Sequence, residues 1–177
     1  AFLALGIALI CMGLYILFRF NNWAFSVGTI AALAIDAFSV IGIYSLFWKV
    51  MPFSMEIDQT FVAAILTIVG YSINDKVVVF DRIREYRHLY PKRDLLTVFN
   101  DSMNATLART INTGLSTILV IFCILFFGGD AVRSFVFAMM IGIITGTVTS
   151  LFVASPVAFR IMSKQQHEVK EATGKSK

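Results

Sequence analysis

The chain has 177 residues, of which 58% are hydrophobic, and it carries only 15 Lys or Arg and 11 Asp or Glu. A soluble domain is typically about 45–50% apolar and about 25% charged, so this composition argues against a water-soluble globule. A disordered chain is excluded as well, because such chains are poor in aromatic residues and this one has 17 Phe. Cys11 and Cys123 both lie in apolar runs, which excludes a disulfide framework. The class that remains is an all-α membrane protein with several spans.

Five stretches are long and apolar enough to cross a bilayer, for which a helix needs about 20 mainly apolar residues. In chain order they cover residues of about 1–18, 24–47, 59–80, 109–127 and 132–155. They predict a polytopic helix bundle, with a transmembrane domain over 1–163 and a cytoplasmic tail over 164–177. Because the chain begins at Ala1, already in hydrophobic sequence, we expect it to be a fragment of something larger.

The distribution of positive charge predicts the orientation of these spans. Twelve of the 15 basic residues lie in the turn at Arg19, in the connection 81–109 or in the segment after the fifth span. The positive-inside rule places these segments in the cytoplasm. With five spans, the start of the chain then lies outside and its C-terminus in the cytoplasm. Topology therefore accounts for the basic excess, and no nucleic-acid partner is expected.

The connection between the third and fourth spans contains a predicted amphipathic helix over about 93–107. Its apolar residues recur at every fourth position with polar residues between them: Leu95, Phe99, Met103 and Leu107. Asp94 lies near its start, where the helix dipole favours an acid. Either this helix lies on the cytoplasmic membrane surface, or its apolar stripe packs on the protein's own helices.

Small residues recur at every fourth position along the fifth span and form one ridge: Ala138, Gly142, Gly146, Ser150 and Ala154. Such ridges allow helix backbones to approach closely inside a membrane, so we expect the fifth span to pack against another helix. The start of the fourth span is rich in hydroxyl and amide groups, among them Thr113. These groups are explained either by interior packing or by a hydrated path.

Three charged residues lie within predicted spans, namely Asp36, Asp75 and Lys76. A charge at the bilayer centre costs about 3 kcal/mol on insertion scales, so such residues face the bundle interior or water and are candidates for function. At about 1.5 Å per residue, Asp75 lies roughly 9 Å above Asp81, and Asp36 lies roughly 20 Å from the interface. Lys76 points about 100° away from Asp75 around the helix. It would either extend toward the interface or offer a second counter-charge.

Arg109 stands at the cytoplasmic mouth of the fourth span, from where its long side chain could reach Asp75. A lone buried carboxyl favours its neutral form, and a nearby Arg favours the ionised form. The two residues could therefore act as a proton switch, paired when Asp75 is ionised and separated when it is neutral. The alternative is a static ion pair that only holds the third and fourth spans together.

The run from Gly70 to Glu85, Gly-Tyr-Ser-Ile-Asn-Asp-Lys-Val-Val-Val-Phe-Asp-Arg-Ile-Arg-Glu, resembles the signature of the SecF family. Members of this family are the smaller subunits of the SecD–SecF protein-export complex. Similar family stretches are Ala-Thr-Leu-Ala-Arg-Thr at 105–110, Phe-Gly-Gly at 127–129 and Leu-Phe-Val-Ala-Ser at 151–155. The resemblance extends from about Arg19 to Met162.

The resemblance implies a membrane domain of the resistance-nodulation-division type. The chain would contain the last five of six spans, without the first span and the periplasmic domain. The implied activity is proton-driven assistance of protein export across the bacterial cytoplasmic (inner) membrane. The implied partners are SecD, the SecY–SecE–SecG channel and the translocating polypeptide, with protons as the coupling ion and no other cofactor.

In the family, the aspartate of the Asn-Asp pair and the arginine that opens the next span serve proton passage. These positions are Asp75 and Arg109 here, and the secondary candidates are Asn74, Asp36, Lys76 and Thr113. The chain departs from the family pattern at Lys76, where Thr or Ser is usual. It also departs at Ile35, where many members have His before the aspartate of that span.

Three other classes compete with this interpretation. One is an exporter of small molecules or lipids from the same superfamily, and another is a purely structural anchor. The third is an intramembrane aspartyl protease, but Asp36 and Asp75 lack the Gly-x-Gly-Asp context, and their expected depths differ by about 10 Å. His88 and His167 are isolated in the sequence, so we expect no metal site. The sequence also lacks the phosphate-binding Gly-Lys-Ser/Thr loop that would indicate an ATPase. We therefore do not expect an enzyme.

Overall fold

The computed structural model describes residues 2–50, 53 and 55–174. These residues form the helices α1 (Phe2–Phe20), α2 (Trp23–Phe47), α3 (Gln59–Leu89), α4 (Leu95–Phe127), α5 (Asp130–Thr149), η1 (Ser150–Ala154) and α6 (Ser155–Gly174). The described part of the chain contains helices and no strand, which confirms the predicted all-α fold.

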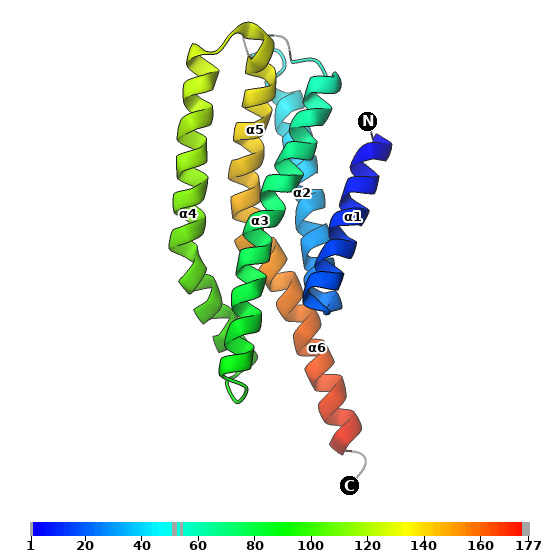
Figure 1. Ribbon diagram of the computed structural model, residues 1–177. Helices are drawn as coiled ribbons and strands as arrows, with labels where there is room; N and C mark the ends of the chain where they lie inside the picture. Colours follow the sequence, from blue (N-terminus) through cyan, green and yellow to red (C-terminus); the bar gives the residue numbers. More distant parts are fainter. Residues whose placement is uncertain (1, 51–52, 54, 175–177) are drawn as a thin grey trace.

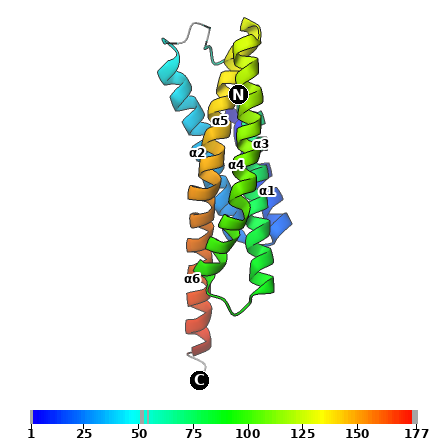
Figure 2. The same cartoon turned by 90° about the vertical axis from the view of Figure 1, so that its left-hand side faces the viewer.

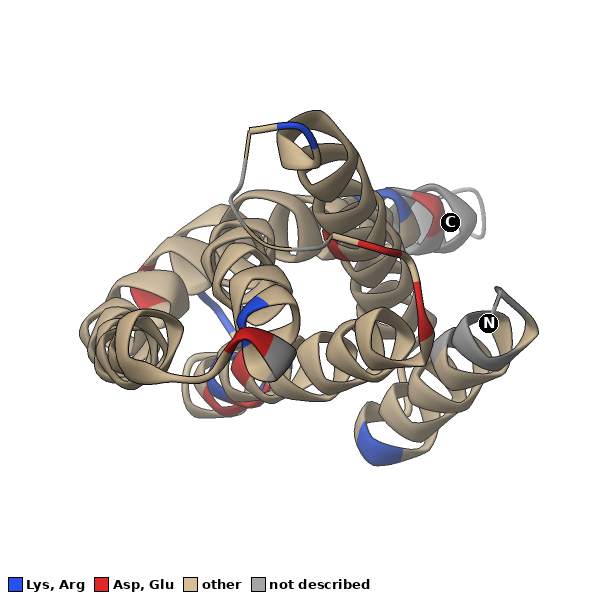
Figure 3. Ribbon diagram, turned by 90° about the horizontal axis from the view of Figure 1, so that it is seen from above, with Lys and Arg blue, Asp and Glu red and all other residues tan. Residues whose placement is uncertain are grey.

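The helices form an elongated bundle (Figure 1). Helix α5 packs against α2, α3 and α4, whereas α1 contacts α2 and α3 and lies at the edge of the bundle (Figure 3). The α1–α2 turn, the α3–α4 loop and the end of α6 lie at one end, which we call the basic end (Figures 1 and 2). The α2–α3 connection and the α4–α5 turn lie at the other, which we call the far end.

Polar side chains cap the starts of three helices, where backbone N–H groups have no partner within the helix. Asn22 accepts a 2.9 Å hydrogen bond from the Ala24 N–H at the start of α2. Asp58 accepts one of 2.9 Å from the Phe61 N–H at the start of α3, and Asp94 one of 3.3 Å from the α4 backbone. These caps define where each helix re-enters the bundle after a connection.

By length and composition, four described helices could cross a membrane: α2, α3, α4 and the continuous helix Val132–Gln166, which joins α5, η1 and part of α6. A fifth apolar stretch in α1, Gly6–Phe20, is shorter. The polytopic helical architecture is therefore confirmed. Ala1, the start of the first predicted span, lies outside the described residues.

The helix count differs from the prediction at the fourth span. The expected amphipathic helix at about 93–107 and the span at about 109–127 form the single helix α4. Neither Gly nor Pro occurs between Leu95 and Thr113, so nothing in the sequence interrupts the backbone hydrogen bonds. Leu95 and Phe99 are buried, and the Phe99 ring packs 5.4 Å from the Phe159 ring of α6. This part of the apolar stripe therefore packs on the protein's own helices, while Leu107 at its end is exposed.

Helix α6 continues through the expected start of the tail at residue 164, as far as Gly174. Lys175 and Lys177, which were expected in this tail, lie outside the described residues. The described apolar core has two large clusters, one toward each end of the bundle, and a small third cluster of Ile121, Val136 and Ile143. The cluster near the basic end includes Phe25, Phe80 and Ile83, and the cluster near the far end includes Tyr44, Phe61 and Phe137.

Candidate functional site: a buried charge network

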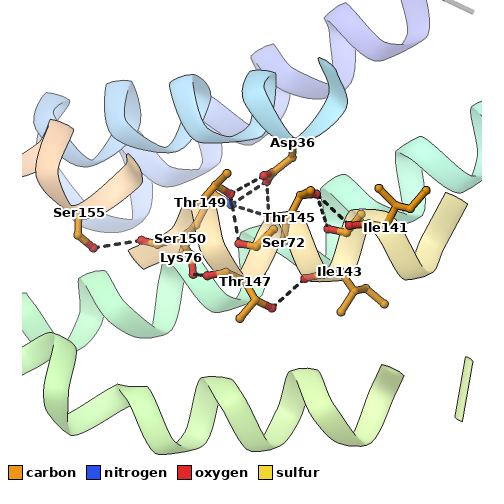
Figure 4. A network of polar contacts seen from close by, with 12 residues as sticks. Asp36, Ser72, Lys76, Ile141, Ile143, Thr145, Thr147, Thr149, Ser150 and Ser155 are labelled. Atoms are coloured by element: carbon orange, nitrogen blue, oxygen red, sulfur yellow. Dashed lines mark hydrogen bonds and ion pairs between the residues drawn. The ribbon is translucent and has the colours of Figure 1, made fainter. Parts of the chain in front are cut away.

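A polar layer lies between the two large apolar clusters. It consists of Asp36 from α2, Ser72 and Lys76 from α3, and Thr149 from the end of α5, all of which are buried (Figure 4). Polar groups buried at this depth are stable only when they are hydrogen-bonded, and charges only when they are paired. The layer meets both conditions through contacts among its own members.

An ion pair forms the centre of this layer. The Lys76 ammonium nitrogen lies 3.0 Å from Asp36 Oδ2, and neither side chain has any solvent-exposed surface. The ammonium also donates to the Ser72 hydroxyl at 2.5 Å and to the Thr149 hydroxyl at 3.5 Å. Ser72 donates to Asp36 Oδ2 at 2.6 Å, and Thr149 donates to Asp36 Oδ1. Both carboxylate oxygens and the ammonium are therefore satisfied, as a buried ion pair requires.

The direction of side chains on a helix explains how Lys76 reaches Asp36. The Cα–Cβ bonds of a helix tilt toward its N-terminus, and α3 runs from the far end to the basic end. The Lys76 side chain therefore extends toward the far end, along the turn that carries Ser72 four residues earlier. Its length bridges the difference in depth between its own Cα and Asp36.

The ridge of small residues in α5 and η1 packs inside the bundle, and its two glycines lie against α3. Ala138, Ser150 and Ala154 are fully buried. A Cβ added at Gly142 would lie 2.4 Å from the Ile68 side chain, and one at Gly146 would lie 2.8 Å from the Ser72 hydroxyl and 3.8 Å from Asp36 Oδ2. Gly146 therefore provides the space in which Ser72 and Asp36 meet.

Asp75 lies beside this network but does not take part in it. The residue is 4% exposed, and its buried Oδ2 has no hydrogen-bond partner among the described residues. Two cations lie close enough for their charge to act on the carboxyl group, Lys76 and Arg109. No ion pair joins Asp75 to Arg109 within the part of the chain that the structure describes, and Arg109 is exposed. The two residues thus lie on neighbouring helices, with no ion pair between them among the described residues.

The other two candidates also lie outside the network. Thr113 links α3 to α4, since its backbone carbonyl accepts a hydrogen bond of 3.3 Å from the Tyr71 hydroxyl. The Thr113 hydroxyl donates to the Arg109 carbonyl at 2.8 Å within α4. Asn74 is exposed.

Sequence reasoning named Asp36 and Lys76 separately and did not join them, and it did not single out Ser72 or Thr149 for this site. The sequence did contain a signal for this pairing. Two opposite charges in two spans of one bundle attract each other strongly, so Asp36 and Lys76 were candidates for an ion pair. The same geometry does not favour the protease interpretation. The Asp36 carboxylate is occupied by Ser72, Lys76 and Thr149, and no hydrogen bond joins it to Asp75 among the described residues.

Comparison with known proteins identifies the family. The chain is 47% identical over 168 residues to the protein translocase subunit SecF of Rhodothermus marinus, an alignment that covers 95% of this chain and 54% of that protein. It is 40% identical over 166 residues to the SecF subunit of Petrotoga mobilis, covering 94% and 53%. The chain thus spans about half the length of the curated relatives it matches.

A solved structure agrees with these relatives. The crystal structure of SecDF in the super-membrane-facing form superposes with a TM-score of 0.80 at 41% sequence identity, covering 94% of this chain and 21% of that one. Residues 1–164 match the family described as "Protein export membrane protein SecD/SecF, C-terminal". The resemblance in the Gly70–Glu85 run is therefore confirmed, and the chain belongs to the SecD/SecF C-terminal family of protein-export membrane proteins.

Proposed function

We propose that the chain is the membrane part of a SecF-type subunit that uses proton flow to assist late steps of polypeptide translocation and release across the bacterial inner membrane. Its partners would be SecD, the SecY–SecE–SecG channel and the translocating polypeptide. The basic end would face the cytoplasm, in keeping with the positive-inside rule. Family membership supports the link to protein export, and the buried charges support the link to protons.

The observation that carries the proton-driven part is the environment of Asp75. Its Oδ2 is buried without a hydrogen-bond partner among the described residues, and the neighbouring Lys76 ammonium is directed to Asp36. A charge buried without a partner is costly, whereas a neutral carboxyl in the same place costs much less. The arrangement therefore suits a proton-bound Asp75.

Arg109 supplies the second half of the proposed cycle. A groove of about 220 Å³ between α3 and α4 is lined by Arg109, Val78 and Thr106 among others. Loss of the Asp75 proton to water would create a carboxylate that attracts the Arg109 guanidinium, which shares this groove with the Asp81 and Glu85 side chains. Protonation would release it, so that each proton taken up and given off would change the contact between α3 and α4.

The test uses the full-length protein together with SecD, reconstituted in vesicles with the translocation channel. We expect Asp75→Asn and Arg109→Met to abolish the stimulation of export by a proton gradient. ATP-driven translocation and assembly with SecD should persist. Asp81→Asn is the matched control, because Asp81 lies on the same helix but is exposed in an ion pair with Arg19. Full gradient-dependent export by both Asp75→Asn and Arg109→Met would disprove the assignment of these residues.

A further inference from the structure

The Lys76 ammonium has three hydrogen-bond partners among the described residues. They are Asp36 of α2, Ser72 of α3 and Thr149 of α5. The carboxyl group of Asp75, the preceding residue, has an oxygen that is left without a partner among the described residues. Lys76 is therefore a cation that is paired with Asp36 and whose neighbour in the sequence, Asp75, keeps an unpartnered carboxyl oxygen.

Few other charged groups can influence this cation. Helix α4 contributes Arg109, whose charge acts on Asp75. The described charges of α5, Asp130 and Arg133, pair with each other at 2.6 Å at the far end, and Arg19 of α1 pairs with Asp81 toward the basic end. The position of the Lys76 ammonium therefore depends chiefly on the charges of Asp36 and Asp75.

Thr149 connects this cation to the backbone of α5. Its hydroxyl lies 3.5 Å from the Lys76 nitrogen, donates to Asp36 and approaches the Gly146 carbonyl at 3.2 Å. Thr149 is also the last residue of α5 before the π-helical turn η1. Such turns interrupt the regular hydrogen bonding of a helix, bend it and occur frequently at functional sites.

The η1 turn has contacts that allow it to serve as a junction. The Ser155 hydroxyl donates to the Ser150 carbonyl at 3.2 Å, which satisfies one of the acceptors in this irregular turn. Helix α2 approaches the turn closely at Gly28, where an added Cβ would lie 2.7 Å from the Ala154 carbonyl oxygen. Helix α6 begins immediately beyond this junction and continues to the basic end (Figure 1).

We propose that Lys76 is a positioning residue that transmits the charge state of Asp75 to the junction between α5 and α6. When Asp75 releases its proton to water, the new carboxylate competes with Asp36 for the Lys76 ammonium. The ammonium moves away from Asp36 and Thr149, and the α5–α6 junction is released to bend at η1. Proton binding by Asp75 restores the arrangement seen here. The inference rests on the proposed function in that Asp75 is taken as the proton site.

The test measures a distance across the junction in the full-length protein with SecD, in lipid nanodiscs at acidic and alkaline pH. Spin labels replace Arg84 of α3 and Arg160 of α6, which are both exposed, and the exposed Cys11 and Cys123 are changed to Ala. We expect the distance between the labels to change with pH in the otherwise unaltered protein. In Asp75→Asn we expect it to remain at its acidic value.

Two variants remove the transmission without changing Asp75. Asp36→Asn combined with Lys76→Met removes both charges of the pair together, which avoids leaving one of them buried alone. Thr149→Val removes only the hydroxyl that links the pair to α5. We expect both variants to lose most of the pH-dependent change in distance. Thr147→Val is the matched control, because among the described residues its hydroxyl bonds only to the Ile143 carbonyl of its own helix, and it should retain the full change.

The inference is overturned if the double variant retains the full pH-dependent change, or if the unaltered protein has none. Gradient-driven export by the same variants, reconstituted in vesicles with the translocation channel, separates this failure from failure of the proposed function. If Asp75→Asn loses gradient-driven export and the double variant keeps the full pH-dependent change in distance, the role of Lys76 is rejected but the proton site is not. Normal gradient-driven export in Asp75→Asn would instead reject the proton site on which the inference rests.

Discussion

Lys76 and Asp36 lie 40 positions apart in the chain and form a 3.0 Å ion pair in which both side chains are fully buried. The pair joins α3 to α2, and the Thr149 hydroxyl extends it to α5. A buried ion pair stabilises a fold only as long as both partners are present, because either charge alone would be left without water and without compensation. This dependence separates the effects of single and double substitutions.

Asp36→Asn alone should destabilise the protein strongly, by about 3–5 kcal/mol, because the Lys76 ammonium would remain buried without its anion. The double variant Asp36→Asn with Lys76→Met should recover most of this loss. Thermal unfolding of Asp36→Asn, Lys76→Met and the double variant in detergent gives the coupling free energy between the two residues. Equal destabilisation by the single and the double variants would show that the pair is not coupled.

The ion pair between Arg19 and Asp81 should behave differently. Its atoms are 3.3 Å apart, but the two side chains are 41% and 52% exposed. Exposed pairs contribute at most about 1 kcal/mol and are screened by salt, so Asp81→Asn should change stability by less than that amount. Unfolding measured at low and high salt checks this expectation. A loss as large as that of Asp36→Asn would contradict it.

Gly146→Ala should disrupt the polar layer from the side of α5, because its Cβ would lie 2.8 Å from the Ser72 hydroxyl. We expect a loss of about 1–3 kcal/mol, which is typical of overpacking a filled interior. Gly70→Ala is the control, since it lies on an exposed face of α3 with nothing within 4 Å of the added Cβ. Alanine favours a helix over glycine, so Gly70→Ala should be neutral or slightly stabilising. Unfolding midpoints of the two variants should therefore move in different directions or by clearly different amounts.

The start of α3 should depend on pH through Asp58. The hydrogen bond from the Phe61 N–H holds the pKa of the Asp58 carboxyl below its usual range. A carboxyl whose pKa is lowered by folding stabilises the folded state above its unfolded pKa, and this contribution is lost as the pH falls through its folded pKa. The Phe61 amide should therefore be less protected against hydrogen exchange in acid, once the exchange rate is corrected for the intrinsic effect of pH.

Asp58→Asn is the control for this effect, because Asn caps a helix about as well as Asp but does not titrate. In this variant, the protection of the Phe61 amide against exchange should stay constant when the pH falls below the usual pKa of an aspartate. The same loss of protection in both proteins would assign the effect to a group other than Asp58.

Apolar length predicted the starts of two helices well. The spans expected from about 24 and 59 begin at Trp23 in α2 and at Gln59 in α3. Prediction was less accurate at α4, where the change from an amphipathic to an apolar pattern suggested two helices. The backbone continues through that change, because a helix ends where its hydrogen bonding is interrupted and not where its surroundings change from water to lipid.

The candidate site could be predicted only in part. The presence of Asp36, Asp75, Lys76 and Arg109 in or beside apolar spans was enough to mark them, since charges in such places are costly and rarely accidental. Their pairing was not predictable from spacing along single helices. The approach of Lys76 to Asp36 depends on the direction of its long side chain and on the space left by Gly146 of a third helix.

The sequence by itself determined that this protein is a helical membrane protein of the SecD/SecF family, because hydrophobic length and the Gly70–Glu85 motif are properties of contiguous segments. Only the tertiary structure decided which charges meet. In this bundle Lys76 pairs with the carboxylate of Asp36 and not with that of Asp75. Arg109 forms no ion pair with either aspartate among the described residues. The physical reason is that an ion pair between helices depends on how their faces are turned toward one another, which is determined by the packing of all the helices together.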